Sequence, residues 1–195
     1  RVIDNLGPAD SPGAFSALAI TENDIPHVFN AQTIAETDGL KVPPAKGRSD
    51  MRALPFVTID GADARDFDDA VLATPLEGGG WEIRVAIADV SHYVRPGSAL
   101  DAEARKRGNS VYLPDRVVPM LPEALSNDLC SLRPNEPRAA MVAIITMDED
   151  GDVTSHSFER ALIRSAARLT YDKVQAWQEG GMTAGELELD EAILT

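Results

Sequence analysis

The chain has 195 residues, of which 44% are hydrophobic and 26% are charged, and its formal net charge is −14. No apolar run is long enough to span a membrane, so the composition indicates a globular chain with a hydrophobic core and no membrane partner. The negative charge disfavours a uniformly basic nucleic-acid-binding surface, because phosphates are normally neutralised by lysine and arginine. The single cysteine, Cys130, excludes an internal disulfide and is consistent with a reducing cytoplasm.

Two helices are predicted in the first part of the chain. Ser11 followed by Pro12 is a typical helix start, because a serine side chain caps free N–H groups and proline suits the first turn. This pattern predicts a helix that continues to about Asn23. Asn30 is a second capping residue and predicts a short helix over residues 31–37.

Residues 41–52 are predicted to be a connector, because they contain two adjacent prolines and a glycine. They are also the most basic part of an acidic chain. Their cations either face solvent or bind phosphates or nearby acids. These cations are Lys41, Lys46, Arg48 and Arg52.

Residues 60–69 read DGADARDFDD and contain five aspartates. Residues 54–59 are apolar and β-branched, which predicts a buried strand that ends where the aspartates begin. Gly61 then breaks the strand, and residues 70–73 begin the next β-type run. Phe67 is an apolar residue among the aspartates, which indicates that the loop packs against the protein. We therefore expect this loop to point several carboxylates at one place.

Carboxylates that lie close together repel one another, so a folded protein usually needs a cation to neutralise them. Oxygen ligands without histidine or cysteine favour Mg²⁺, or Mn²⁺, over Zn²⁺. One or two such ions can support phosphodiester hydrolysis, because they activate water and stabilise the leaving oxygen. The alternative is an acidic loop that is simply solvated.

Two β-type runs and a helix are predicted after the loop. Residues 81–88 form the second run, joined to the first by three glycines, and their mostly apolar character predicts a central strand. Asp89 at its end either caps the following turn or joins the aspartate cluster. Ser98 begins a capping-box-like pattern and predicts a helix over residues 99–107, which Gly108 ends.

The last third of the chain predicts two strands and a helix. Residues 139–146 form a β-type run, and the acidic segment 148–152 follows it. This segment resembles a calcium loop, but Val153 stands where that loop requires glycine, so we expect a hairpin turn at Asp150-Gly151 instead. Thr170 is the predicted cap of the final helix.

Six motifs of the chain resemble the ribonuclease II/ribonuclease R family, nearest to its bacterial ribonuclease R branch. They cover roughly the last three-quarters of the chain. The motifs are LPFVTIDGADARDFDDAV at 54–71, VAIADVS at 85–91, SVYLP at 110–114, PMLP at 119–122, LSNDLCSL at 125–132 and RLTY at 168–171.

The resemblance implies an α+β fold, with a mostly antiparallel sheet, flanking helices and part of an RNB-type catalytic domain. Residues 53–195 would be the amino-terminal part of that domain, residues 14–52 a helical linker, and residues 1–13 the tail of a preceding cold-shock-type (OB) barrel. The rest of the catalytic domain and an S1 domain would lie outside this chain. We therefore expect a fragment whose active site is incomplete and which is inactive alone.

The activity implied by the resemblance is Mg²⁺-dependent, hydrolytic, processive 3′-to-5′ degradation of single-stranded RNA to nucleoside 5′-monophosphates. The metal site would use Asp60, Asp66, Asp68 and Asp69, with Asp66 and Asp68 also catalytic and Asp68 the most critical. Tyr112 would bind RNA by stacking on its bases, which tolerates any base. The alternative function is that of a non-catalytic RNA-binding or regulatory relative of the family.

Overall fold

The structure is a computed structural model that describes residues 12–183. It divides the chain into two compact units. The helical unit comprises residues 12–40 and 94–126, and the sheet unit comprises residues 41–93 and 127–183. In the described part of the chain, no helix is long and apolar enough to cross a membrane.

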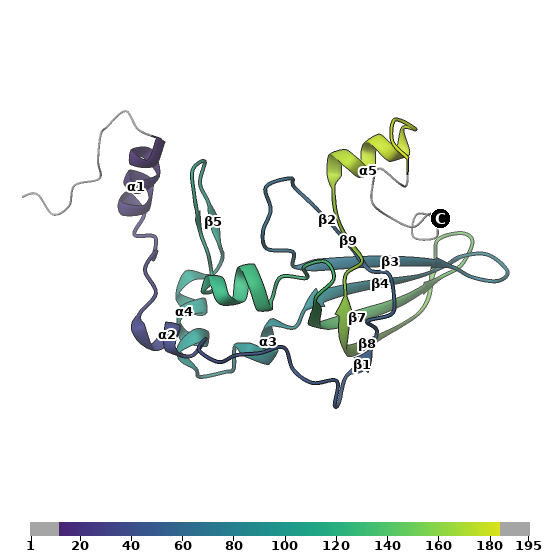
Figure 1. Cartoon of the computed structure of the whole chain (residues 1–195), viewed down its shortest axis with the longest axis horizontal. Coiled ribbons are helices and arrows are strands. Elements are labelled where there is room, and N and C mark those ends of the chain that lie inside the picture. Colours follow the sequence, from purple (N-terminus) through teal and green to yellow (C-terminus); the bar gives the residue numbers. More distant parts are fainter. Residues whose placement is uncertain (1–11, 184–195) are drawn as a thin grey trace, which may run out of the picture. The chain divides into compact units, whose positions relative to one another are not determined.

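The helical unit contains three helices and a small two-stranded sheet (Figure 1). Its elements are α1 (Pro12–Glu22), α2 (Ala31–Ala35), α4 (Ala99–Arg107), β5 (Val111–Tyr112) and β6 (Val117–Val118). The predicted helices are all present, although α2 ends two residues early. The predicted cap Ser11 and the other residues of the predicted barrel tail, apart from the first two residues of α1, lie outside the described residues.

Capping explains where the short helices of this unit begin. The Asn30 side chain accepts a hydrogen bond from the Thr33 N–H at 2.8 Å, and the Ser98 side chain accepts one from the Asp101 N–H at 3.1 Å. Glu36, just after α2, adds a carboxylate that accepts the N–H groups of Ala99 and Leu100 at 2.9 and 2.8 Å. These bonds satisfy N–H groups that have no partner within the helix, and they join α2 to α4.

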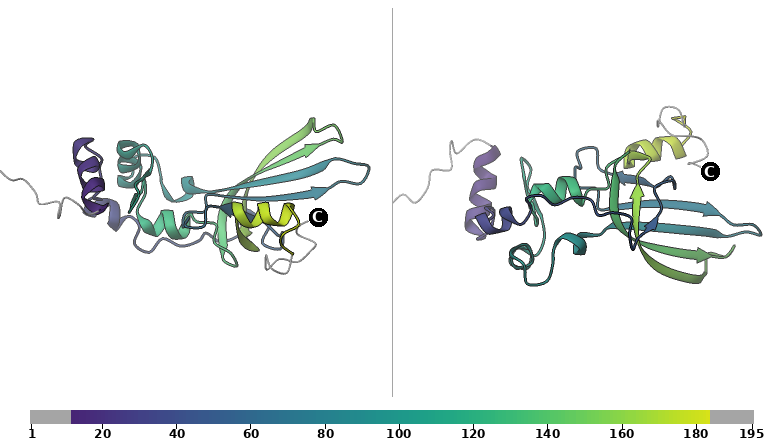
Figure 2. Two further views of the ribbon diagram at one scale, coloured as in Figure 1. Left: turned by 90° about the horizontal axis from the view of Figure 1, so that it is seen from above. Right: turned by 60° about the horizontal axis from the view of Figure 1, so that its bottom comes forward.

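The sheet unit is built on a seven-stranded sheet of order β1-β8-β7-β4-β3-β2-β9 (Figures 1 and 2). Neighbouring strands are antiparallel except for the pairs β1–β8 and β2–β9 at the two edges. The α+β class with a mostly antiparallel sheet is therefore confirmed. The strands are β1 (Ser49–Asp50), β2 (Val57–Asp60), β3 (Asp69–Pro75), β4 (Trp81–Ala88), β7 (Pro137–Met147), β8 (Val153–Arg164) and β9 (Ala167–Thr170).

Strand β4 lies in the middle of the sheet, as its apolar sequence predicts, and pairs with β3 and β7 along its length. The long β7–β8 hairpin turns at Gly151, whose φ of 85° suits glycine and confirms the predicted turn.

Short helices complete the unit: α3 (Val90–Tyr93) and α5 (Tyr171–Gln178), the latter capped by Thr170 as predicted. A π-helical turn, η1 (Leu125–Leu129), carries the chain from the helical unit into the sheet unit.

The predicted strand over residues 54–59 is shorter in the structure, since β2 begins only at Val57. Pro55 has no N–H to donate to a ladder, and the Phe56 N–H bonds locally to the Leu54 carbonyl at 2.9 Å. Phe56 is fully buried and its carbonyl accepts the Ala166 N–H at 2.7 Å. Phe56 and Thr58 are therefore buried, while the other residues of the segment are half-buried and only its second half is a strand.

The connector contains a buried ion pair. Arg48 donates to Asp89 at 2.6 Å, and both side chains are almost completely buried. Burial opposes ionisation of Asp89, but the hydrogen bonds from Arg48 and Ser91 outweigh it and hold the pKa of Asp89 below its usual value. Of the two roles predicted for Asp89, the structure favours the turn, because its carboxylate is occupied by Arg48 and Ser91 rather than by the aspartate loop.

Candidate functional site

The aspartate loop, defined as residues 60–69, connects the end of β2 to the start of β3. The two strands are antiparallel, with Val57 opposite Val71. The end of β2 and the start of β3 therefore lie side by side at the same end of the two strands, and Asp60 and Asp69 lie at the two ends of the loop. This is the arrangement that the sequence predicted.

The carboxylates of the loop influence one another. Burial first, and then repulsion from Asp69 and Asp66, raises the pKa of Asp60, and Arg168 only partly opposes this. Solvent still reaches Asp68, but partial loss of hydration together with repulsion from Asp66 and the other two aspartates raises its pKa as well. The four predicted aspartates therefore share one negative region whose charges disfavour one another.

One carboxylate oxygen of this region is buried without a hydrogen-bond donor. Oδ2 of Asp60 is buried and has no hydrogen-bond partner. A buried carboxylate oxygen without a donor is costly, and a cation would satisfy it. The donors are all carboxylate oxygens, which suit Mg²⁺ or Mn²⁺. The chemistry of the donor set therefore fits the predicted ion.

The complete coordination shell is not assembled in the structure. Within residues 12–183, no three histidine, cysteine, aspartate or glutamate side chains are arranged so that they could hold a metal ion. The assignment of Asp60, Asp66, Asp68 and Asp69 as ligands therefore stays a prediction. Asp63, which the sequence left without a role, lies exposed on the turn.

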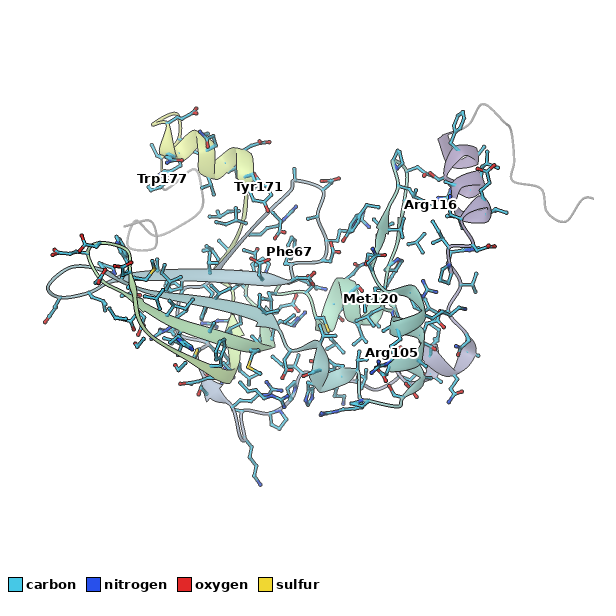
Figure 3. All side chains as sticks on the ribbon, turned by 180° about the vertical axis from the view of Figure 1, so that it is seen from behind. Phe67, Arg105, Arg116, Met120, Tyr171 and Trp177 are labelled. Carbon is cyan, nitrogen blue, oxygen red and sulfur yellow. The ribbon has the colours of Figure 1, made fainter. Side chains whose placement is uncertain are left out.

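The carboxyl-terminal half of the loop is anchored by buried residues. Phe67 is only 6% exposed, and its side chain lies at the base of the loop (Figure 3). Its N–H donates to Oγ of Ser131 at 3.1 Å, and its carbonyl accepts the Leu132 N–H at 2.8 Å. Ser131, fully buried, also donates to the Arg65 carbonyl at 3.0 Å. The main-chain groups of the residues on either side of Asp66 are thus held by hydrogen bonds to Ser131 and Leu132.

The amino-terminal half of the loop is anchored by Arg168 on β9. Nη2 of Arg168 donates to the carbonyl oxygens of Gly61 at 3.2 Å, Ala62 at 2.5 Å and Ala64 at 3.3 Å. Its guanidinium carbon lies 5.1 Å from the centre of the Phe67 ring. A single cation therefore binds the backbone of the acidic turn and contacts the aromatic anchor.

Sequence reasoning assigned no role to Ser131 or Arg168. Arg168 belongs to a motif that resembles the family, yet the motif alone says nothing about its contacts. The hydrogen-bond partners of the Arg168 side chain are at least 104 residues away in sequence and those of the Ser131 side chain at least 64. No local pattern reports such contacts.

Tyr112, the predicted RNA-binding residue, belongs to the helical unit. It lies on β5, and its side chain is 64% exposed. An exposed aromatic ring is available for stacking on a base. Its role in RNA binding stays a prediction.

Residues 48–193 match the family model for the RNB domain. The chain is 52% identical over 184 residues to ribonuclease R of Vibrio cholerae, an alignment that covers 92% of this chain and 22% of that protein. The chain thus spans about a fifth of the length of this curated relative.

Solved structures agree with this match. The fold is similar to that of Mycoplasma genitalium RNase R in complex with ribose methylated single-stranded RNA, with a TM-score of 0.89 and 34% identity, over 97% of this chain and 30% of the other. It is also similar in fold to yeast Ssd1, a pseudonuclease, with a TM-score of 0.76 and 18% identity, over 95% of this chain and 24% of the other. The chain belongs to the RNB-domain family that includes ribonuclease R.

Proposed function

We propose that this chain supplies the acidic metal site of a Mg²⁺-dependent exoribonuclease that acts on single-stranded RNA in the cytoplasm. The full protein would hydrolyse RNA processively from the 3′ end to nucleoside 5′-monophosphates. The observation that carries the proposal is the aspartate loop of an RNB domain, with its mutually repelling carboxylates and a buried Oδ2 on Asp60 that has no donor.

The proposed roles follow from where the aspartates lie. Asp60 and Asp69, at the two strand ends, are the principal metal ligands, and Asp66 supports them from the anchored half of the loop. When bound, Mg²⁺ (or Mn²⁺) supplies positive charge to the scissile phosphate and lowers the pKa of a water molecule. Asp68 reaches solvent and is the residue on which the chemical step most depends.

RNA binding must come from other residues, because carboxylates repel phosphates. Tyr112 is proposed to stack on bases near the 3′ end, which requires no particular sequence. The remainder of the catalytic domain and an S1 domain are proposed to supply further contacts to the RNA. This division explains how a chain with a net charge of −14 can serve a ribonuclease.

The test uses the full-length protein that contains this chain, with 5′-labelled single-stranded RNA, with and without Mg²⁺. We expect release of mononucleotides and a short end product only with Mg²⁺. Asp68→Asn should abolish cleavage and leave RNA binding largely intact, because binding relies on other residues. Asp63→Asn is the matched control, since it makes the same charge change in the same loop and should retain activity. Full activity of Asp68→Asn would contradict the proposal.

A non-catalytic RNA-binding protein is the second candidate, because the same fold also occurs in a pseudonuclease. The presence of all four aspartates in this chain argues for the enzyme. The same assay separates the two, because the second candidate would retain RNA without cleaving it at any Mg²⁺ concentration.

A further inference from the structure

Arg168 is unusual because one terminal nitrogen serves three carbonyl groups of the same turn. Its strand, β9, runs parallel to β2, with Arg168 beside Thr58 and Thr170 beside Asp60. The guanidinium reaches past the end of β2 to the carbonyls of Gly61, Ala62 and Ala64. These carbonyls belong to the turn 61–64 that directly follows Asp60, so their position determines where the loop leaves the strand.

The rest of the loop already has its own anchors. Asp60 is fixed by β2, and Phe67 is fixed by Ser131 and Leu132. Between these points, the turn has one backbone hydrogen bond of its own, from the Ala64 N–H to the Gly61 carbonyl at 3.2 Å. Arg168 therefore supplies most of the restraint on the segment that separates Asp60 from Asp66.

The burial of Arg168 indicates that this contact has a cost. Its Nε is buried and has no hydrogen-bond partner. An unpaired buried donor destabilises a fold, and Arg84 and Arg107 carry such a nitrogen as well. In Arg168 the hydrogen bonds to the turn offset this cost.

We propose that Arg168 is a positioning residue that holds the backbone of residues 61–64 so that Asp60 and Asp66 are placed to bind a divalent cation. The inference rests on the proposed function, because it concerns the same metal site. In this role Arg168 would act through the backbone of the loop rather than as a metal ligand. Preorganisation of this kind lowers the conformational cost of gathering the ligands.

The positive charge of Arg168, in contrast, opposes binding of a metal cation by the aspartates. If electrostatics dominated, removing that charge would therefore strengthen binding of the metal cation. The hydrogen bonds that Nη2 of Arg168 donates go to three backbone carbonyl oxygens of the turn, so this side chain acts on the loop through its position. We therefore expect placement of the loop to dominate.

Two variants of the full-length protein separate placement from charge. Arg168→Lys keeps the charge but replaces the planar fork with a shorter group of different geometry, and Arg168→Gln removes the charge as well. Arg164→Gln is the control, because Arg164 is an exposed arginine at the end of β8, the strand that precedes β9 in sequence and lies near the opposite edge of the sheet. Mn²⁺ alone is titrated into each protein, and free Mn²⁺ is measured by electron paramagnetic resonance.

We expect Arg168→Lys and Arg168→Gln to weaken Mn²⁺ binding by about 10- to 100-fold, as loss of a residue supporting a metal ligand typically does. Arg164→Gln should bind Mn²⁺ like the wild type. Higher Mg²⁺ should partly restore RNA cleavage to the Arg168 variants, whereas RNA affinity should not change. Circular dichroism of the metal-free proteins checks that each variant is folded.

Unchanged Mn²⁺ affinity in Arg168→Lys would overturn the proposal, as would tighter binding in Arg168→Gln. Unfolding of both variants without metal would also overturn it, since Arg168 would then be needed for the fold itself. The outcome is distinguishable from failure of the proposed function. If the wild type binds Mn²⁺ but does not cleave RNA, the enzyme is refuted and the Arg168 result still stands.

Discussion

The sheet unit contains two acidic segments that look alike in sequence and differ in structure. The aspartate loop has five aspartates in ten residues, and the turn at residues 148–152 has four acids in five. In the turn, Oδ1 of Asp148 accepts the N–H groups of Asp150 and Asp152 at 3.1 and 2.9 Å. Asp150 and Asp152 themselves are exposed. The turn is therefore held by hydrogen bonds between its own residues, and its other carboxylates are exposed to solvent.

The aspartate loop is held by residues far away in sequence instead. Ser131 and Arg168 bind its backbone, Phe67 fills the space beneath it, and Oδ2 of Asp60 is buried without a donor. A high density of acidic residues is therefore not enough to make a functional site. A site forms where distant residues fix the backbone and leave carboxylates unsatisfied.

The largest effect on stability is expected from the aromatic anchor. Phe67→Ala should lower the free energy of unfolding by about 3–5 kcal/mol, because it leaves a cavity beneath the loop. Val153→Ala, beside the acidic turn, should change it by less than about 0.5 kcal/mol, since Val153 is 59% exposed. Urea denaturation of the full-length protein measures both. Equal losses would mean that the two segments do not differ in packing.

A smaller effect is expected from the buried serine. Ser131→Ala removes the donor to the Arg65 carbonyl and the acceptor of the Phe67 N–H, leaving a buried N–H unpaired. The expected cost is about 1–3 kcal/mol. Asp148→Ala is the counterpart in the turn and should cost less, because solvent can replace its bonds to exposed N–H groups. A larger loss for Asp148→Ala would reverse the comparison.

The smallest effect concerns the charge of the loop without metal. Because the pKa of Asp68 is raised in the folded protein, its ionised form opposes folding, and this penalty is present at neutral pH and disappears as the pH falls through that pKa. With EDTA present, Asp68→Asn should therefore raise the melting temperature by a few degrees at pH 7. The gain should shrink as the pH approaches 4, roughly the ordinary aspartate pKa.

The matched variant for this measurement is Asp150→Asn, which removes an exposed charge from the turn. It should leave the melting temperature nearly unchanged at both pH values. Mg²⁺ should stabilise the wild type more than Asp68→Asn, because binding to the folded state adds stability. A lower melting temperature for Asp68→Asn in EDTA would show that its charge supports the fold.

Local sequence patterns predicted where several helices and one turn begin. Ser98, Asn30 and Thr170 cap helices where predicted, and Gly151 makes the expected turn. These features depend on residues a few positions apart, so sequence can report them. The strand before the loop was predicted too long, because Pro55 prevents ladder bonding at its start.

The sequence by itself determined that four aspartates flank one strand-to-strand reversal and that a hydrophobic residue lies among them. Only the tertiary structure decided what holds that reversal in place. The side chains of Arg168 and Ser131 bind its backbone from 106 and 66 residues away in sequence. The parallel pairing of β9 with β2 places Arg168 beside the end of β2, and Ser131 contacts the loop next to Phe67. Hydrogen bonds of this range depend on the register of the sheet, which no local pattern encodes.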